Sequence, residues 1–590
     1  MPHSFKTSLR TLFILFWISG ITPTSWKQSI TTLLHKKDDP HLLANKRPIG
    51  LINTITKVWT RFVTEVLATY AADNHILSNC QEGFTSGRST SRHLQRLAHT
   101  LEDARTSHRD IYGLYLDLTS AFNTISHAHL FRIMTDLGFP PDAVSTIRDI
   151  YSNVTTRIVL NRSKQLLTDP ILVGRGTIQG DTLSPLIFLI FLEPLLRWLS
   201  VGGHGYTPTC IMSDPSFSHP CIATQSSPAF ADDLALLSPN HNNLQGQFEK
   251  VLLYCKWAGL SINASKCAVT GILHASCQGQ SLGDHTSLLR QRLRNKFITL
   301  DGLHSIPFLP PASPYKYLGI HLTFNLDFRH HLADLIISIK RMASRLIMCN
   351  IPPLSALSIL QSVLRPRLTY CFCLTPFSLT DIHTLDDVLV TITRIIMGLA
   401  GRSGTNTAFP SQLILCSAFH GGVGLSSLLK DYIAISTQTI TRALNDTTSD
   451  LGLLTLAMLK QQLLTYGHMP APLLPRRRHF HPLPSFANSP SCTWLISHYT
   501  VNQGGSSISI LVMICVSPFH SFFPLLLLHP PPPPPPLTSP PSSHPCGTLA
   551  LSRLRLSSST ARMAPSCTLP LVLTSSVLPP VKPLISNLLK

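Results

Sequence analysis

Three carboxylates in apolar surroundings have the types and spacing that best fit catalysis in this sequence. Asp117 ends an apolar stretch of strand composition at 111–117, and the adjacent pair Asp232 and Asp233 interrupts a second apolar stretch at 229–238. Two neighbouring carboxylates inside a buried strand would repel each other and lose hydration, which costs several kcal/mol. The pattern around the pair therefore favours the tip of a hairpin.

A bound divalent cation would remove this electrostatic cost. Mg²⁺ prefers one or two carboxylates together with phosphate oxygens. Two strand-end carboxylates on neighbouring strands could hold two Mg²⁺ ions about 3.5–4 Å apart, an arrangement that serves phosphoryl transfer to a 3′-hydroxyl. Mn²⁺ is an alternative ion. The competing interpretation is a solvated turn with two surface aspartates, and Asp117 alone is unspecific.

The charge of the chain is uneven along its 590 residues. It holds 48 lysines and arginines against 29 aspartates and glutamates, a formal net charge of +19, which suits a polyanionic partner such as nucleic acid. Every carboxylate lies at or before Asp450, so chemistry that needs a carboxylate must use the first 450 residues. Residues 451–590 are rich in Pro, Ser and Leu, which predicts a low-complexity tail without a packed core.

Periodicity and turn residues predict the elements that must position these carboxylates. A helix is expected over 51–67, and a second, strongly apolar helix is expected to start at Ser184 as its N-cap. The glycine-rich loop 174–180 precedes it. A short strand is expected at 315–321, and the pattern over 326–450 is helical with lysines and arginines along it.

Five blocks of the sequence, in order and at suitable intervals, resemble the catalytic blocks of reverse transcriptases. They lie at 115–125, 175–186, 230–233, 259–267 and 317–320. The upstream segments 23–27, 35–40, 45–51 and 81–90 resemble the fingers of non-LTR (LINE-type) retrotransposon polymerases, and 9–20 looks like the helix that leads into them. The resemblance covers roughly residues 10–430.

This resemblance implies an α/β (α+β) right-hand polymerase. The fingers would occupy residues 1–110, and a ferredoxin-like palm with the catalytic blocks 111–325. A helical thumb and connection would follow at 326–450, and the tail at 451–590.

The resemblance also assigns roles to single residues. Asp117, Asp232 and Asp233 would bind the two metal ions. Phe122 would lie beneath the sugar and exclude a 2′-hydroxyl by its bulk; the alternative is a core aromatic. Lys266 would give a proton to departing pyrophosphate; the alternative is a solvated lysine.

Further residues are implied to hold the nucleotide and template. Gln179 and Gly180 would let the backbone approach closely, since glycine has no Cβ. Arg47 would grip the incoming triphosphate together with Lys36 or Lys37, and the forked guanidinium makes Arg47 the better candidate.

The implied function is an RNA-directed DNA polymerase that acts on an RNA template, a DNA or RNA primer and dNTPs. Two alternatives remain open: an inactive retroelement relic that only binds RNA, and an intron-maturase-like splicing cofactor. Relatives of this type usually carry an endonuclease ahead of the fingers, so a truncated copy is expected here. The tail is either a frame-shifted remnant or a genuine basic arm that binds RNA.

The location in the cell is only partly indicated. Lys6 and Arg10 followed by the apolar run 12–18 imitate a signal peptide, but the helix leading into the fingers is the preferred interpretation. The 14 cysteines include no C-x-x-C pair, which favours reduced thiols in an intracellular protein. We expect no stable membrane association, and nucleus and cytoplasm are not distinguished.

Overall fold

The structure is a computed structural model of the whole chain. The residues that it describes are 3–36, 39–161, 166–208, 228–274, 282–299, 302, 304–349, 351–399, 410–446, 451–452, 454–455, 458, 493–503, 506–516 and 524–529.

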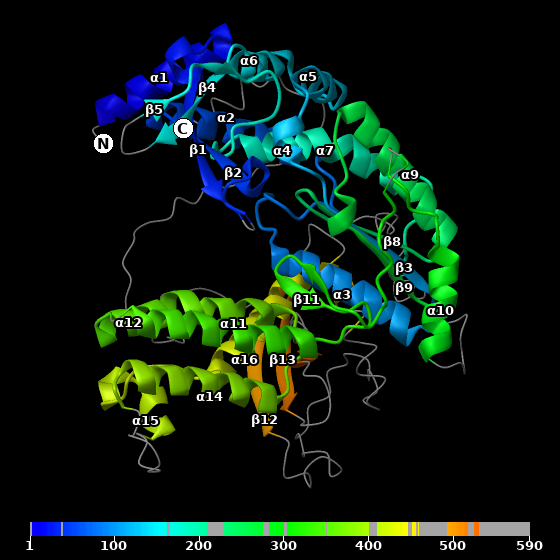
Figure 1. Cartoon of the computed structure of the whole chain (residues 1–590), viewed down its shortest axis with the longest axis vertical. Coiled ribbons are helices and arrows are strands. Elements are labelled where there is room, and N and C mark those ends of the chain that lie inside the picture. Colours follow the sequence, from blue (N-terminus) through cyan, green and yellow to red (C-terminus); the bar gives the residue numbers. More distant parts are fainter. Residues whose placement is uncertain are drawn as a thin grey trace, which may run out of the picture.

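The N-terminal part combines a small sheet with helices (Figure 1). Strand β1 (Gln28–His35) pairs antiparallel with β2 (Lys46–Ile52) and parallel with β4 (Thr155–Asn161), and the short strands β5 (Leu166–Leu167) and β6 (Ile171–Leu172) both pair with β4. The predicted leading helix is confirmed as α1 (His3–Ser19). It is anchored by Phe13, whose ring lies 5.3 Å from that of Trp59 on α2 (Thr54–Asp73).

A four-stranded antiparallel sheet lies at the centre of the molecule. Its order is β7-β8-β3-β9, with β3 (Ile111–Leu116) between β8 (Asp233–Ser238) and β9 (Ala268–Ile272), and β7 (Ala229–Phe230) at the edge. The strand predicted at 111–117 is thus confirmed and ends one residue before Asp117. The apolar stretch 229–238 forms the predicted hairpin.

Strand β3 is buried on both faces, which explains its continuous apolar sequence. Because side chains alternate along a strand, Tyr112, Leu114 and Leu116 enter one hydrophobic core, and Ile111 and Tyr115 enter another. The first core is filled by α7 (Ser184–Ser200) and α9 (His241–Ala258), and the second by α3 (Thr90–Thr106) and by helices further along the chain.

The remaining helices of the first 300 residues complete this region. They are α4 (Ala121–Thr124), α5 (His127–Asp136), α6 (Pro141–Tyr151) and α10 (Leu282–Leu293).

Two local predictions need correction. Ser184 is not the N-cap of α7: Leu183 is, and the Ser184 hydroxyl donates instead to the carbonyl of Ile178, 2.8 Å away. The single strand expected at 315–321 is a hairpin of β10 (Tyr315–Tyr317) and β11 (Ile320–Leu322). Its turn is possible because Gly319 takes a φ of +85°, a left-handed value that glycine adopts without strain.

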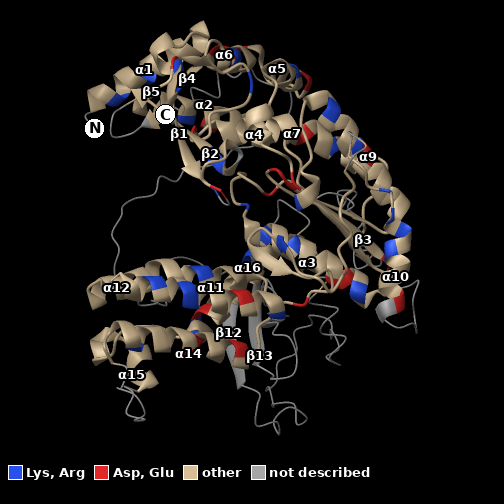
Figure 2. Cartoon of the chain, in the orientation of Figure 1, with Lys and Arg blue, Asp and Glu red and all other residues tan. Residues whose placement is uncertain are grey.

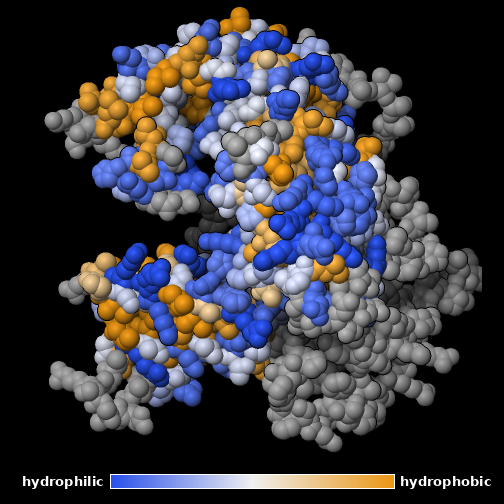
Figure 3. Space-filling model, turned by 45° about the vertical axis from the view of Figure 1, so that its right-hand side comes forward, coloured by the Kyte–Doolittle hydropathy of each residue, from blue (hydrophilic) through white to orange (hydrophobic). Residues whose placement is uncertain are grey.

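The segment 326–450 is helical, as predicted. Figure 1 shows these helices as a separate stack below the N-terminal part, and the space-filling view shows an opening between the two (Figure 3). Among the described helices none is long and apolar enough to cross a membrane. The helices are α11 (Arg329–Met348), α12 (Pro353–Ile359), α13 (Arg365–Thr369), α14 (Leu379–Ile396), α15 (Ser411–Leu415) and α16 (Leu428–Leu444).

Packing continues past residue 450. Leu451, Leu454 and Met458 are all buried. Further on, β12 (Thr493–Gln503), β13 (Ser506–Val516) and β14 (Pro524–His529) pair as an antiparallel sheet. The polyproline run and most of 461–590 lie outside the described residues, so the prediction of a tail without a core stays a prediction.

Candidate active site

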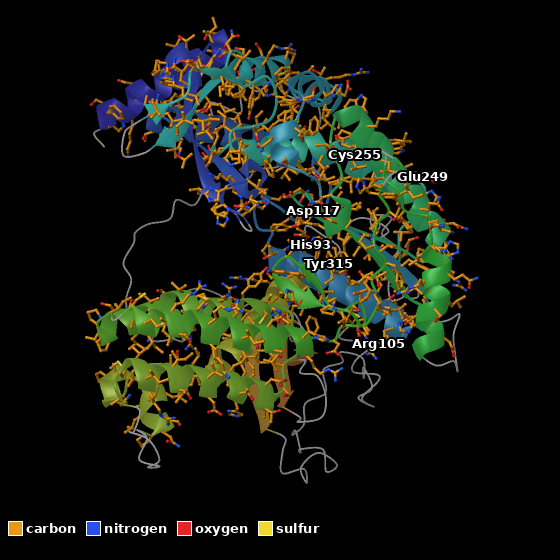
Figure 4. All side chains as sticks on the ribbon, in the orientation of Figure 1. His93, Arg105, Asp117, Glu249, Cys255 and Tyr315 are labelled. Atoms are coloured by element: carbon orange, nitrogen blue, oxygen red, sulfur yellow. The ribbon has the colours of Figure 1, made fainter. Side chains whose placement is uncertain are left out.

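Strand pairing brings the three predicted carboxylates to one edge of the central sheet. Leu116 on β3 pairs with Leu234 on β8, so Asp117 lies one residue beyond this pair on one strand and Asp233 one residue before it on the other. In an antiparallel pair these two positions are neighbours. Figure 4 shows Asp117 in the middle of the molecule, between the N-terminal part and the C-terminal helices.

The hairpin that carries Asp232 has a two-residue turn. Phe230 pairs with Asp233, which leaves only Ala231 and Asp232 in the turn, and Ala231 has a φ of +55°. A left-handed conformation is uncommon for residues other than glycine and is costly unless the surroundings enforce it. Asp232 therefore projects from a strained turn and is only partly buried.

The pKa values of Asp232 and Asp233 are both raised. The pKa of Asp233 is raised to about 7, first by burial and then by the charges of Asp232 and Asp117. The pKa of Asp232 is also raised, first by burial and then by Asp117. Such a group of carboxylates is charged together only when a cation compensates them.

Lys266 supplies the positive charge nearest to these carboxylates. It closes a short helical turn at Ala264–Lys266, and its Nζ lies 2.8 Å from Asp117 Oδ2. The same ammonium lowers the pKa of both Asp232 and Asp233. The prediction that Lys266 belongs to the site agrees with this geometry, and its first partner is Asp117.

The donor chemistry fits a divalent cation, although the side chains do not form a closed cage. Carboxylate oxygens are the ligands that Mg²⁺ and Mn²⁺ prefer. Within the described part of the chain, no group of three or more His, Cys, Asp or Glu side chains is already arranged around a metal position. Asp117 instead directs an oxygen to the Lys266 ammonium, so an ion would have to compete with this lysine.

Aromatic side chains support this edge from below. Tyr315 stacks on Tyr115 of β3 with ring centroids 4.4 Å apart, and its hydroxyl donates to the Lys266 carbonyl at 2.7 Å. Buried His93 lies 2.8 Å from the Tyr317 hydroxyl, and Figure 4 shows His93 and Tyr315 just below Asp117. The sequence analysis included 317–320 among the five family-like blocks but assigned Tyr315 no role. Its contact with Lys266 joins residues 49 positions apart, and a local pattern does not show such a contact.

Phe122 lies on α4, directly after the strand that leads to Asp117. Its ring stacks on Phe188 of α7 at 4.4 Å and meets the edge of exposed Phe84 at 6.3 Å. The side chain is only partly buried. Phe122 is therefore packed on the core and also partly exposed, so the two predicted interpretations are compatible.

The loop with Gln179 and Gly180 packs between α4 and β2. The Gln179 amide donates to the Asn123 side chain at 3.0 Å, and the Gly50 N–H donates to the Gln179 carbonyl at 2.7 Å. Gly180 has a φ of +117°, and a Cβ there would lie 2.7 Å from the Gly50 carbonyl oxygen. Glycine is thus required at position 180 by a close contact with Gly50 of the same chain. The sequence prediction had attributed this glycine to contact with the nucleotide and template.

Two of the three basic residues predicted to hold a triphosphate lie on or next to the first sheet. Arg47 on β2 is exposed and pairs in register with Leu34 on β1, and Lys36 follows the end of β1. The charge of Lys36 lowers the pKa of Asp232, so Lys36 acts electrostatically on the carboxylate site. Lys37 lies outside the described residues.

Gln81 is the contact that sequence reasoning missed most clearly. Its side chain is buried and bonds to the backbone of Ala231 in the carboxylate turn. The segment 81–90 was singled out only by its resemblance to known polymerases. The local sequence around Gln81 offers only Gly83, two positions later, and this does not identify a partner 150 residues away.

Sequence comparison gives the family of the part of the chain that carries this carboxylate edge. Residues 34–322 match the family described as "Reverse transcriptase (RNA-dependent DNA polymerase)", and this part of the chain belongs to that family. Members of the family use divalent metal ions. The resemblance noted from the five blocks is thereby confirmed.

The curated relatives come from retrotransposons. The chain is 25% identical over 420 residues to a Pol polyprotein of the R2DM element of Drosophila melanogaster, covering 71% of this chain and 36% of that protein. It is 32% identical over 266 residues to one from an R2 element of Popillia japonica (44% and 34%), and 24% identical over 366 residues to the RNA-directed DNA polymerase from mobile element jockey of Drosophila melanogaster (60% and 35%). The chain thus spans about a third of the length of these relatives.

Among solved structures, apo telomerase from Candida tropicalis aligns with 79% of this chain and 74% of its own. The TM-score is 0.35 and the sequence identity 10%. These values are too low to carry an argument about function.

Proposed function

We propose that this chain is an RNA-directed DNA polymerase that extends a DNA or RNA primer with dNTPs on an RNA template. The observation that carries the proposal is the meeting of Asp117, Asp232 and Asp233 at one sheet edge, within a segment that belongs to the reverse transcriptase family. The raised pKa values of Asp232 and Asp233, caused first by burial and then by neighbouring carboxylates, are typical of a functional site that holds cations.

Two Mg²⁺ ions are the proposed cofactor, with Mn²⁺ as the alternative. Asp117, Asp232 and Asp233 would hold them. When bound, such ions activate the attacking hydroxyl and neutralise the charge of the phosphates. Lys266 would act from the same side: its ammonium neutralises Asp117 in the ion-free chain, and it is the group placed to give a proton to the leaving pyrophosphate.

The triphosphate would be held by basic residues on and next to the first sheet. Arg47, Lys36 and Lys37 are proposed to bind the triphosphate, and the effect of Lys36 on the pKa of Asp232 supports this direction of approach. Phe122, exposed in part beside Asp117, is proposed to exclude a 2′-hydroxyl. Gln179 and Gly180 would line the path of nucleotide and template.

The proposed division into fingers (1–110), palm (111–325), thumb (326–450) and tail (451–590) follows from the same function. Exposed Lys340, Arg341 and Arg345 lie on α11, which borders the opening, and Figure 2 shows the basic segments of this helix. In the space-filling view the wall formed by the C-terminal helices is strongly hydrophilic where it faces the opening (Figure 3). Such a surface suits the phosphates of a template and primer.

Primer extension by the full chain with Mg²⁺ tests the proposal. We expect dNTP incorporation on an RNA template, and Asp232→Asn should reduce it by at least about 10³-fold, because an amide cannot compensate the ion's charge. Asp136→Asn is the matched control, since this exposed carboxylate on α5 pairs only loosely with Arg132 at 3.7 Å.

The alternatives predict other results. A relic would bind RNA without incorporating dNTPs. A maturase-like cofactor would accelerate intron splicing, and Asp232→Asn would leave that acceleration intact. Incorporation that survives in Asp232→Asn would overturn the carboxylate assignment.

A further inference from the structure

The strained turn of the carboxylate hairpin is held by one buried side chain. Gln81 accepts a hydrogen bond from the Ala231 N–H at 2.8 Å through Oε1 and donates to the Ala231 carbonyl at 3.3 Å through Nε2. One amide thus bonds to both polar backbone groups of the residue that has a φ of +55°. Its Oε1 also accepts from the Gly83 N–H at 2.8 Å.

The segment that carries Gln81 is itself fixed against the hairpin. Ala229 exchanges backbone hydrogen bonds with it: the Glu82 N–H donates to the Ala229 carbonyl at 2.8 Å, and the Ala229 N–H donates to the Cys80 carbonyl at 2.9 Å. A Cβ at Gly83 would lie 2.4 Å from the Ala231 nitrogen, so only glycine allows this approach. The scaffold therefore leaves the Gln81 amide little freedom to move away from the turn.

Ion pairs continue this scaffold to the C-terminal helices. The carboxylate of Glu82 is fully buried and meets Arg92 at 3.1 Å and Arg96 at 3.4 Å. Arg92 also bonds to Asp446, just beyond the end of α16, at 2.6 Å. These ion pairs thus link the segment of Gln81 to α3 and, through Asp446, to the end of α16.

We infer that Gln81 is a positioning residue of the proposed polymerase: its amide holds Ala231 in the left-handed conformation and thereby sets the direction in which Asp232 meets the metal ions. The inference rests on the proposed function for its catalytic consequence. Its structural part, the control of the turn, stands independently. A hydrocarbon side chain of the same length would fill the space but would leave both backbone groups of Ala231 without these bonds.

The primary test is hydrogen exchange at the Ala231 amide, measured by mass spectrometry on the full chain. Gln81→Met should accelerate exchange of this amide by about 10-fold or more, because its direct acceptor is lost. Gln95→Met is the matched control: Gln95 is a buried glutamine on α3, and the same substitution there should leave Ala231 exchange unchanged. If Gln81→Met does not fold, Gln81→Asn, whose amide is one methylene short, replaces it.

The second readout separates positioning from simple packing. In primer extension, Gln81→Met should raise the Mg²⁺ concentration for half-maximal incorporation by about 5–10-fold and leave RNA affinity within about 2-fold. Ala231→Gly should restore most of this loss in the double variant, because glycine adopts a positive φ without support. A packing defect would not be rescued in this way.

The outcomes are separable. Unchanged Ala231 exchange in folded Gln81→Met, or an equal loss with and without Ala231→Gly, would overturn the inference. Accelerated exchange in a chain that never incorporates dNTPs would confirm control of the turn and would contradict only the proposed function.

Discussion

Lys266 and Asp117 lie 149 positions apart in the sequence, and the lysine ammonium donates to the aspartate carboxylate at 2.8 Å. The same ammonium lowers the pKa of Asp232 and Asp233. In the absence of a metal ion, the site therefore carries its own counterion. Lys266 can consequently be either a counterion or a proton donor, and the two roles predict different kinetics.

Replacing Lys266 by methionine distinguishes these roles. Without the ammonium the pKa values of Asp232 and Asp233 rise further, so the acid limb of the pH profile of dNTP incorporation should move to higher pH. If Lys266 also protonates pyrophosphate, the plateau should fall by about 10²-fold or more. Lys256→Met, at the exposed end of α9, should change neither quantity; a pH profile identical to wild type in Lys266→Met would refute both roles.

Asp233 should reduce stability at neutral and alkaline pH. The pKa of Asp233 in the folded chain, about 7, lies above that of an unfolded aspartate. The neutral side chain therefore makes its full contribution to the free energy of unfolding below about pH 4, and this contribution is lost as the pH rises through about 7. Asp233→Asn should therefore raise the free energy of unfolding at pH 8 in EDTA by about 1–2 kcal/mol after solvent screening.

The measurement is denaturant unfolding of wild type and Asp233→Asn at several pH values. The difference should shrink toward pH 4, where both side chains are neutral. A difference that is independent of pH would show that it comes from packing and not from charge.

Phe122 should influence the choice between sugars. Phe122→Val removes bulk beside the carboxylate edge and should raise ribonucleotide incorporation relative to deoxynucleotide by roughly 10–200-fold, the equivalent of ~1–3 kcal/mol. The comparison is kcat/KM for dNTP and rNTP with the same primer and template. Phe131→Val on α5 is the control for loss of an aromatic ring; if both variants keep the wild-type ratio, Phe122 is a core residue that stacks on Phe188.

Deletions at two points test where the packed part of the chain ends. Removing 461–590 should leave the melting temperature unchanged, whereas removing 451–590 should also delete buried Leu451, Leu454 and Met458 and lower the unfolding free energy by about 3–6 kcal/mol. The measurement is thermal unfolding of both deletions beside the full chain. A large loss on removing 461–590 would contradict a tail without a core.

The shorter deletion also separates the two accounts of the tail. A basic arm that binds RNA would make the slope of log affinity against log salt shallower when it is removed, since fewer counterions are released. A frame-shifted remnant would leave this slope unchanged. Filter binding of one RNA at several salt concentrations decides between them.

The carboxylates were predictable from sequence because their signal is local. One apolar run ends in Asp117 and another is interrupted by Asp232. Each carboxylate can therefore be recognised from fewer than about ten neighbouring residues. The two strands of the β10–β11 hairpin were read as one, although Gly319 could have indicated the turn. Gln81 could not be assigned a role, because its bond to Ala231 depends on how two distant segments pack.

The alternation along β3 limits the kinds of change this region can accept. Every residue of the strand faces one of two filled cores, so no face remains to absorb a shift in register. A one-residue insertion or deletion within 111–116 would exchange the two sets of side chains and turn Asp117 to the opposite side of the sheet. We therefore expect this strand to vary among related copies by substitution only, with differences in length confined to the loops that connect it.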